Sequence, residues 1–361
     1  MACWPSAAPC STTTARAWPA CTASWRATSP STALIPGAGG CRPTATPSSS
    51  CPTRGRDSVA HSATVAYSAT AHVVRPVGTR GVGRGLAAFL RAPRYEIFPT
   101  DDILAVVAQY VPKEVTITVT ASPRRGLPAT VHLAVNLARL GYRAIPHLSA
   151  RLIRDRVELG QILEAVRAAG IHGIFVVAGD ARESAGEFPD ALSLLAALPP
   201  DHGLTEIGVT GYPERHPFIH DDVTIQAMWD KRRYATYIVS NMSFDPDTVK
   251  GWVERVRRRG VELPIYVGMA GVADPARLLR LSTKIGVAES ARFLRGHPSW
   301  LARMFRPGGY EPGRFVSALL PDIAQPDRRI AGLHVFTFNE IEPTERWRRE
   351  MLLRLTQGEG A

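Results

Sequence analysis

From Leu86 onward, short apolar runs rich in β-branched residues alternate with longer stretches whose apolar residues recur at helical spacing. The short runs are typical of buried strands and the longer stretches of amphipathic helices, so their alternation favours a parallel sheet covered by helices. Eight strands are predicted, at Tyr95–Pro99, Glu114–Thr120, Ala144–Ser149, Gly173–Ala178, Glu206–Gly211, Thr236–Asn241, Pro264–Met269 and Leu333–Phe338. Eight strand–helix units in roughly 270 residues fit an α/β fold of the (βα)8 TIM-barrel type better than an open sheet.

The helical segments between these strands support a barrel that spans residues 88–358. The seventh connection, from about residue 270 to residue 330, is long and is expected to hold further helices. The helices predicted from apolar spacing are Ala129–Leu140, Asp155–Ala169, Pro189–Leu198, Asp222–Arg233 and Asp247–Arg259.

Residues 1–85 differ from the rest of the chain in composition and in periodicity. They are rich in Ser, Thr, Ala, Pro and Arg and show neither helical nor strand periodicity. Such a segment cannot bury enough apolar surface to offset its ordering entropy, so we predict that it is disordered and dispensable. The stretch Gly81–Gly85 follows no strand and opens no clear amphipathic helix, and we therefore do not interpret it as a nucleotide-binding loop.

Charge and cysteine usage also separate this segment from the barrel. The net charge is +11, but residues 1–85 hold eight arginines, no lysine and a single acid, Asp57. A nucleic-acid-binding domain concentrates its own basic residues on one face, so nucleic-acid binding is not expected. All five cysteines lie within the first 51 residues. A thiolate nucleophile, a cysteine-ligated zinc and a disulfide framework are therefore not expected in the barrel.

Other classes of protein are disfavoured by patterns that the chain lacks. There is no run of about 18 apolar residues and no secretory signal, so we expect a cytoplasmic protein that makes no membrane contact. No HExxH motif or comparable cluster with ligand spacing is present, and no metal is expected. A homo-oligomer is left open by the sequence.

Polar residues gather where the predicted strands end, which is where a TIM barrel carries its active site. Convergence from six or more strand ends is hard to explain by packing alone. These residues are Glu96, Thr118, Thr120, His147, Ser149, Asp180, Tyr212, Glu214, His216, Asn241, Asn339 and Glu340.

At the same strand ends the chain resembles the methylenetetrahydrofolate reductase family. Tyr95–Pro99 resembles that family's opening Phe-Glu-Phe-Phe-Pro, and Pro146–Ser149 resembles its Pro-His-Leu-Thr. The run that ends in Ala178-Gly179-Asp180 is similar to an apolar run that ends in Arg-Gly-Asp. Tyr212–Pro217 is close to Tyr-Pro-Glu-x-His-Pro, which is the most specific match. Further matches in the family's order are Lys231, Asn241 with Phe244-Asp245, and Phe336-Thr337-Phe338-Asn339.

The resemblance implies a hydride transfer from NAD(P)H through FAD to the methylene group of a folate. It implies that Glu96 is the general acid, and that Asp180 and Asn241 contact the substrate. A carboxyl at the mouth of an apolar barrel can have its pKa raised by desolvation, which suits it to this role. The cofactor contacts implied are Thr118, Thr120, His147, Gly179, Asp180, Tyr212, His216 and Lys231.

The chain departs from the family pattern at positions that concern the cofactor. Ala178 replaces an arginine expected to help hold FAD, and Asn241 replaces a longer glutamine. Weak or absent FAD binding, with hydride taken directly from NAD(P)H, therefore stays open. So does a non-catalytic or partner-dependent barrel that binds a pterin.

Several of these residues also have a plain structural interpretation. Glu96 could pair with a neighbouring base, and Asp180 could cap a helix. Lys231 could belong to a solvated, charged helix face. His147, His216 and Tyr212 could be hydrogen-bonded residues around the site rather than cofactor contacts.

Overall fold

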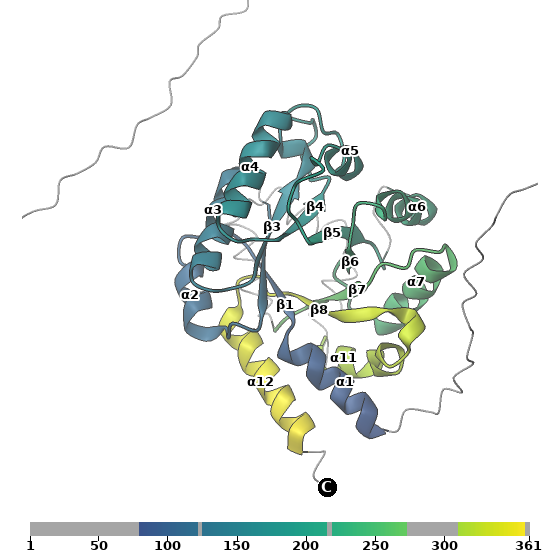
Figure 1. Cartoon of the computed structure of the whole chain (residues 1–361). Helices are drawn as coiled ribbons and strands as arrows, with labels where there is room; N and C mark the ends of the chain where they lie inside the picture. The colour runs from purple at the N-terminus through teal and green to yellow at the C-terminus, as the bar shows by residue number, and fades with distance from the viewer. Residues whose placement is uncertain (1–78, 122–124, 215–218, 273–309, 358–361) are drawn as a thin grey trace, which may run out of the picture. The chain divides into compact units, whose positions relative to one another are not determined.

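The computed structural model describes residues 79–121, 125–214, 219–272 and 310–357. Eight parallel strands follow one another around a closed barrel, and the first strand pairs with the last (Figure 1). The predicted (βα)8 barrel is therefore confirmed. The strands are β1 (Arg94–Ile97), β2 (Thr116–Val119), β3 (Ala144–Ser149), β4 (Gly173–Val177), β5 (Glu206–Gly211), β6 (Tyr237–Ser240), β7 (Ile265–Ala270) and β8 (Ile330–Phe336).

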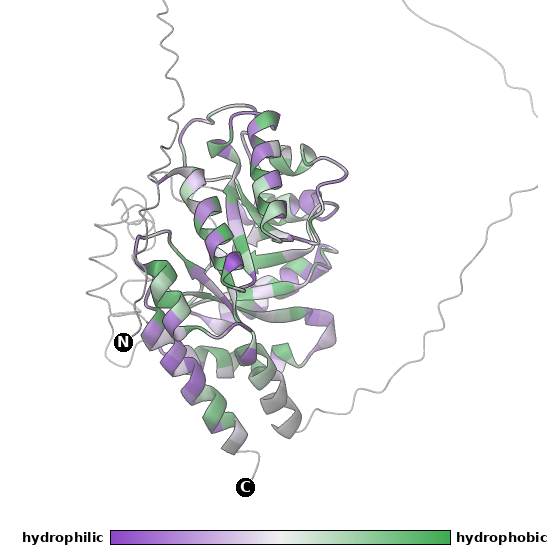
Figure 2. Ribbon diagram, turned by 60° about the vertical axis from the view of Figure 1, so that its left-hand side comes forward, coloured by the Kyte–Doolittle hydropathy of each residue, from purple (hydrophilic) through white to green (hydrophobic). Residues whose placement is uncertain are grey.

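Helices surround the barrel, and they carry hydrophilic and hydrophobic residues side by side (Figure 2). None of the helices in the described ranges is both long and apolar enough to cross a membrane. The helices are α1 (Thr79–Arg91), α2 (Ile103–Tyr110), α3 (Gly126–Arg139), α4 (Arg156–Ala168), α5 (Ala191–Ala196), α6 (Asp221–Lys231), α7 (Pro246–Arg258), α11 (Pro312–Ile323) and α12 (Ile341–Gln357), with 3-10 turns η1 (Ala150–Leu152) and η2 (Pro326–Arg328).

Apolar spacing explains how a helix such as α7 packs on the barrel. Its buried residues Val249, Trp252, Val253 and Val256 recur every three or four positions, so they form one stripe on the helix. Trp252 is fully buried and belongs to the main core cluster, which lies between strands and helices.

Strand β1 shows how the two faces of the barrel wall differ. Successive side chains of a strand point to opposite faces. Tyr95 and Ile97 join the main core on the helix side. Glu96 lies between them and contacts side chains of β3 and β8, so it points into the barrel. Part of the barrel interior is filled by a separate cluster made of Ile145, Phe175, Tyr237 and Val239.

Helix α1 corrects one interpretation of the sequence. The glycine-rich stretch Gly81–Gly85 lies inside this helix, although no helix was expected there. Leu86 and Leu90 of α1 are each only 1% exposed. Tertiary packing of this kind can hold a helix whose glycines give it low intrinsic propensity. The helix contacts α11 and α12, and α12 lies beside it in Figure 1.

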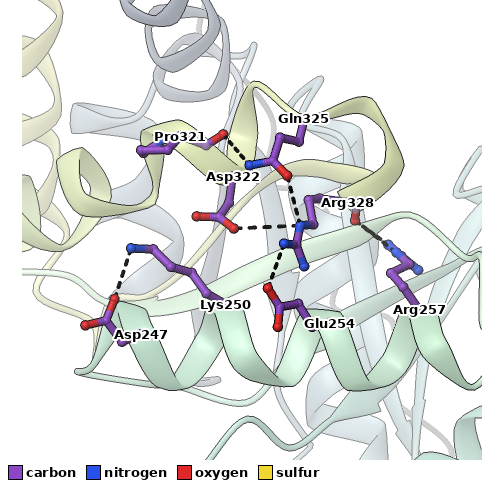
Figure 3. Close-up of polar contacts among 8 residues, drawn as sticks. All are labelled: Asp247, Lys250, Glu254, Arg257, Pro321, Asp322, Gln325 and Arg328. Carbon is purple, nitrogen blue, oxygen red and sulfur yellow. Dashed lines mark hydrogen bonds and ion pairs between the residues drawn. The ribbon is translucent and has the colours of Figure 1, made fainter. Parts of the chain in front are cut away.

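A cluster of polar contacts ties α7 to α11 at the start of β8 (Figure 3). Arg328 donates from Nη2 to Glu254 Oε1 at 2.7 Å and from Nε to Gln325 Oε1 at 3.2 Å. Arg257 donates from Nε to the backbone carbonyl of Arg328 at 3.0 Å. Because these residues precede β8, they brace the end of the barrel that lies opposite the strand C-termini.

Candidate active site

Glu96, the predicted general acid, enters the barrel interior from β1. Its Oε2 lies 3.0 Å from Nε2 of His334 on β8 and 3.9 Å from Nε2 of His147 on β3. The Glu96 side chain is 12% exposed. Burial raises the pKa of the Glu96 carboxyl above its ordinary value, although the charge interaction with His147 opposes the rise. A carboxyl in this setting retains its proton to a higher pH than an exposed glutamate does.

Both histidines beside Glu96 are neutral near pH 7. Burial lowers the pKa of His147 to about 4. Burial, followed by the charge of Arg94, lowers the pKa of His334 to about 3. Two neutral imidazoles do not stabilise a carboxylate as two cations would, so they do not reverse the rise that burial causes in the pKa of Glu96.

Arg94 lies on the same face of β1, two residues before Glu96, but its charge is engaged elsewhere. Its guanidinium carbon lies 4.1 Å from the ring centre of Tyr237 and 3.8 Å from that of Tyr266. Its Nη2 donates to Glu206 Oε2 at 3.2 Å. These contacts form a buried polar layer below Glu96, toward the N-terminal end of β1.

Four buried polar atoms of this interior have no hydrogen-bond partner among the described residues. They are Arg94 Nη1, His147 Nε2, Tyr237 OH and His334 Nδ1. Buried polar groups are nearly always paired, and their exceptions often mark sites with a chemical role. The interior around Glu96 is therefore less fully satisfied than an ordinary core.

The loops after β1 and β8 are locked together, and this fixes the strand end that carries Glu96. Thr337 donates from Oγ1 to the Glu96 carbonyl at 2.6 Å. Asn339 Oδ1 accepts from the Phe98 N–H at 2.8 Å, and its Nδ2 donates to the Phe98 carbonyl and to Thr100 Oγ1, both at 3.1 Å. Asn339 has a φ of 61°, a left-handed conformation that asparagine tolerates.

The strand ends of β4 and β5 supply polar groups on one wall. Gly179 has a φ of 89°, and a Cβ at this position would collide with Ser149 Oγ, so only glycine fits. Tyr212 is half-buried, and its hydroxyl accepts from Thr210 Oγ1 at 3.3 Å. Burial raises the pKa of Tyr212, and the negative charge of Asp180 adds to the rise. Asp180 itself is exposed.

The ends of the next three strands carry apolar and aromatic side chains. Met242, Phe244 and Ala270 form a buried cluster against which Phe336 and Phe338 pack. All of them lie at or just after the C-terminal ends of β6, β7 and β8. Polar groups and aromatic side chains at the same end of a barrel suit a flat heteroaromatic ligand.

Glu214 connects the loops that follow β5 and β6. Its Oε1 accepts from Ser243 Oγ at 2.8 Å and from the Phe244 N–H at 3.1 Å. Asn241 begins the second of these loops and is half-buried. Its Oδ1 accepts from the Met242 N–H at 2.8 Å, which orients the side-chain amide.

The other predicted residues differ in where they lie. Thr118 is buried, and its hydroxyl donates to the Tyr95 carbonyl at 3.4 Å. Thr120 is half-buried just after β2. Lys231 is in the last turn of α6 rather than at a strand end, and burial lowers its pKa while Asp190 and Asp230 oppose the change. His216 lies outside the described residues.

Two plain structural interpretations can now be corrected. Lys231 is half-buried, so a fully solvated helix face does not describe it. Asp180 does not cap α5, because Asp190 does so with a capping box that involves Ser193. Within the described ranges, no group of three or more His, Cys, Asp or Glu residues could hold a metal ion.

Sequence reasoning missed His334 and Arg94, which face the barrel interior beside Glu96 and below it. The alternation of β8 predicted a buried strand, and a histidine in such a strand was one available signal. Its partner Glu96 lies 238 positions away, and no local pattern around His334 points to it.

Comparison with known proteins agrees with the motifs at the strand ends. Residues 102–289 match the methylenetetrahydrofolate reductase family model, which is slightly more than half of the chain. The chain belongs to this family. The matched range takes in the strand ends that carry His147, Asp180, Tyr212 and Asn241. Glu96 and His334 lie on either side of it.

Two curated members of the methylenetetrahydrofolate reductase family illustrate how divergent the chain is. Methylenetetrahydrofolate reductase 2 of Saccharomyces cerevisiae is 27% identical over 166 residues, which is 41% of this chain and 28% of that protein. The 5,10-methylenetetrahydrofolate reductase of Pectobacterium carotovorum is 26% identical over 172 residues, which is 46% of this chain and 54% of that protein. The matches thus span about a quarter and about half of these relatives' lengths.

One solved structure illustrates a distant likeness. Dihydropteroate synthase from Thermus thermophilus is 15% identical and has a TM-score of 0.40, with 75% of this chain and 95% of that chain covered. A likeness at that score carries no weight for function.

Proposed function

We propose that the chain reduces 5,10-methylenetetrahydrofolate to 5-methyltetrahydrofolate with NAD(P)H as the source of hydride. The observation that carries this proposal is the Glu96 carboxyl, which is buried inside the barrel beside two neutral histidines. Family membership supports the substrate class. The alternative is a non-catalytic or partner-dependent barrel that binds a pterin. Such a barrel would not need a proton donor.

The chemistry requires a proton before it requires a hydride. The five-membered ring of the substrate opens to an iminium ion when one of its ring nitrogens is protonated. Glu96 would donate that proton, because its raised pKa keeps it protonated nearer to neutrality. Hydride then adds to the iminium carbon and gives the methyl group.

The remaining site residues would bind and orient the folate. Asp180 at the end of β4 would accept hydrogen bonds from the pterin, and the Asn241 amide would also contact it. The aromatic side chains of Phe336 and Phe338 would exclude water from one side of the ring. A largely dry site strengthens each polar contact within it.

The residues at the ends of β2 to β5 fit a flavin only in part. Tyr212, Thr118, Thr120, His147 and the backbone at Gly179 suit a flat ring, and a bound FAD would supply a carrier of hydride. Ala178, however, gives no cation where the family has an arginine. We therefore propose weak FAD binding, with His216 and Lys231 as further contacts. A visible spectrum of the purified chain with and without added FAD tests this, because tightly retained, stoichiometric flavin would contradict it.

The Glu96→Gln variant tests the catalytic proposal. Glutamine keeps the shape of the side chain and removes the proton, so turnover to 5-methyltetrahydrofolate should fall by about 10²–10⁴ while the folate dissociation constant changes little. A matched control is Glu164→Gln, which alters an exposed residue of α4. Turnover within about threefold of the parent would show that Glu96 is a structural carboxyl. Folate binding without any turnover in the parent would favour the non-catalytic barrel.

A further inference from the structure

His334 is the side chain most closely placed to act on Glu96. It projects into the barrel from β8 and is 1% exposed. Its Nε2 lies 3.0 Å from Glu96 Oε2, which is hydrogen-bond distance. The ring of Phe336, two residues later on the same strand, lies 5.0 Å from the His334 ring centre at 64°. The imidazole is therefore held between an aromatic ring and the carboxyl.

Groups from three strands face His334, and its ring is neutral because of burial and, after it, the positive charge of Arg94. Glu96 and Arg94 face it from β1, and His147 lies across the barrel on β3. On β7 its register partner is Gly268, which has no side chain. The positive charge of Arg94 and burial both oppose a second proton on the ring. A neutral imidazole carries one N–H, on either Nδ1 or Nε2.

We propose that His334 is a positioning residue whose Nε2–H donates to Glu96 Oε2, so that Oε1 is the oxygen that carries the acid proton. This inference rests on the proposed function of Glu96 as the general acid. With this arrangement the contact is attractive before the proton leaves and after it has left. The other tautomer would set the Nε2 lone pair against the lone pairs of the newly formed carboxylate.

The unpartnered atoms around the ring support the same tautomer. Among the residues that the structure describes, His334 Nδ1 is buried without a partner, and so is Nη1 of Arg94, its register neighbour on β1. Arg94 Nη1 is a donor under all conditions. A bare Nδ1 can accept from a donor or from a bridging water, whereas a protonated Nδ1 would be a second buried donor without an acceptor.

The proton transfer balances without any further reactant. The proton leaves Glu96 Oε1 for the substrate nitrogen, and the electrons of the O–H bond remain on the carboxylate. The negative charge spreads to Oε2, where the bond from His334 becomes charge-assisted and therefore stronger. A proton from bulk solvent returns to Glu96 after the product has left and regenerates the acid. His334 thus stabilises the conjugate base of the acid and makes proton release easier.

The tautomer can be measured without any turnover. Nitrogen-15 NMR of histidine-labelled protein, with the His334 signals assigned by their loss in His334→Gln, should show a neutral ring protonated at Nε2 at pH 7. A ring protonated at Nδ1, or a doubly protonated ring, overturns the proposal. If the parent instead fails to reduce methylenetetrahydrofolate, the proposed function fails, and the tautomer still decides the geometry of the pair.

The kinetics of two His334 variants test the same proposal. His334→Gln keeps an N–H donor, and His334→Phe removes it. We expect kcat of the Phe variant to fall about 10- to 100-fold with little change in KM, and its alkaline limb to move to higher pH because Glu96 holds its proton more tightly. The Gln variant should recover to within about threefold of the parent, as should the exposed control His132→Gln. Equal losses in the Gln and Phe variants, or no loss in the Phe variant, contradict the proposal.

Discussion

Two glutamates of low exposure lie on opposite sides of strand β1, Glu96 on its barrel side and Glu345 on its helix side, and they have opposite chemistry. Glu345 of α12 lies on the helix side, where it accepts from Tyr95 OH at 3.1 Å and from Arg348 at 2.7 and 2.6 Å. Burial raises the pKa of Glu345, but its hydrogen bonds from Arg348 and Arg349 outweigh burial and hold the pKa below its ordinary value. Glu96 has a neutral histidine as its hydrogen-bond partner, and its pKa is raised.

Burial alone does not decide the protonation of a carboxyl, because the pKa values of Glu96 and Glu345 shift in opposite directions. Cations at hydrogen-bond distance turn Glu345 into an ionised anchor between β1 and α12. Arg94, the cation of the barrel interior, does not reach Glu96 in this way, since it is paired with Glu206 and contacts the rings of Tyr237 and Tyr266. One strand can therefore carry a structural contact on one face and an acid on the other.

Breaking the anchor should give the largest effect on stability. Glu345→Ala leaves Arg348 buried without its partner, so the free energy of unfolding should fall by about 3–5 kcal/mol. Urea unfolding measures this change. Glu342→Ala is the matched control, because its pair with Arg346 is about half exposed, and its loss should stay within about 0.5 kcal/mol. A loss of that small size at Glu345 would show that the arginines are satisfied without it.

The neutral histidines predict a smaller, pH-dependent effect. The pKa of His334 is lowered to about 3, whereas an unfolded histidine titrates near its ordinary 6.5. Below pH 6.5 the unfolded chain binds the extra proton and the folded chain does not, so stability falls as pH falls toward 3. This single group contributes a slope of about 1.4 kcal/mol per pH unit.

His334→Gln should remove that slope, and unfolding curves between pH 4.5 and pH 7 compare the variant with the parent. The exposed His132→Gln serves as the control and should retain the parental slope. An unchanged slope in His334→Gln would mean that His334 is protonated in the folded chain, which would also alter the charge beside Glu96.

Much of the barrel could be predicted because parallel strands are nearly continuous apolar runs. Strands β3 and β5 have the predicted bounds, Ala144–Ser149 and Glu206–Gly211. Helix α2 was not predicted, because Ile103–Tyr110 is short and almost wholly apolar, so its periodicity is weak. Strand β8 begins at Ile330, three residues before its predicted start at Leu333.

Of the site residues, only those at or just after the ends of predicted strands could be predicted. Glu96 and Asn339 were found because they lie at or after the ends of strands. Glu345 lies in a helix crowded with arginines, a pattern that normally indicates a solvated face. Nothing in that local pattern shows that Tyr95 and Arg348 bury it. Contacts between residues some 240 positions apart depend on barrel closure, which no local pattern encodes.

Whether Glu96 can act as the general acid is decided by the pH at which its carboxyl loses its proton. An infrared difference spectrum between the parent and Glu96→Gln, recorded across a pH series, isolates the carboxyl of this residue. We expect a carboxyl whose titration midpoint lies above the ordinary value of 4.5, because burial raises the pKa of Glu96. A midpoint at or below 4.5 would contradict this expectation, because Glu96 would then be an ionised carboxylate like Glu345 and could not be the acid.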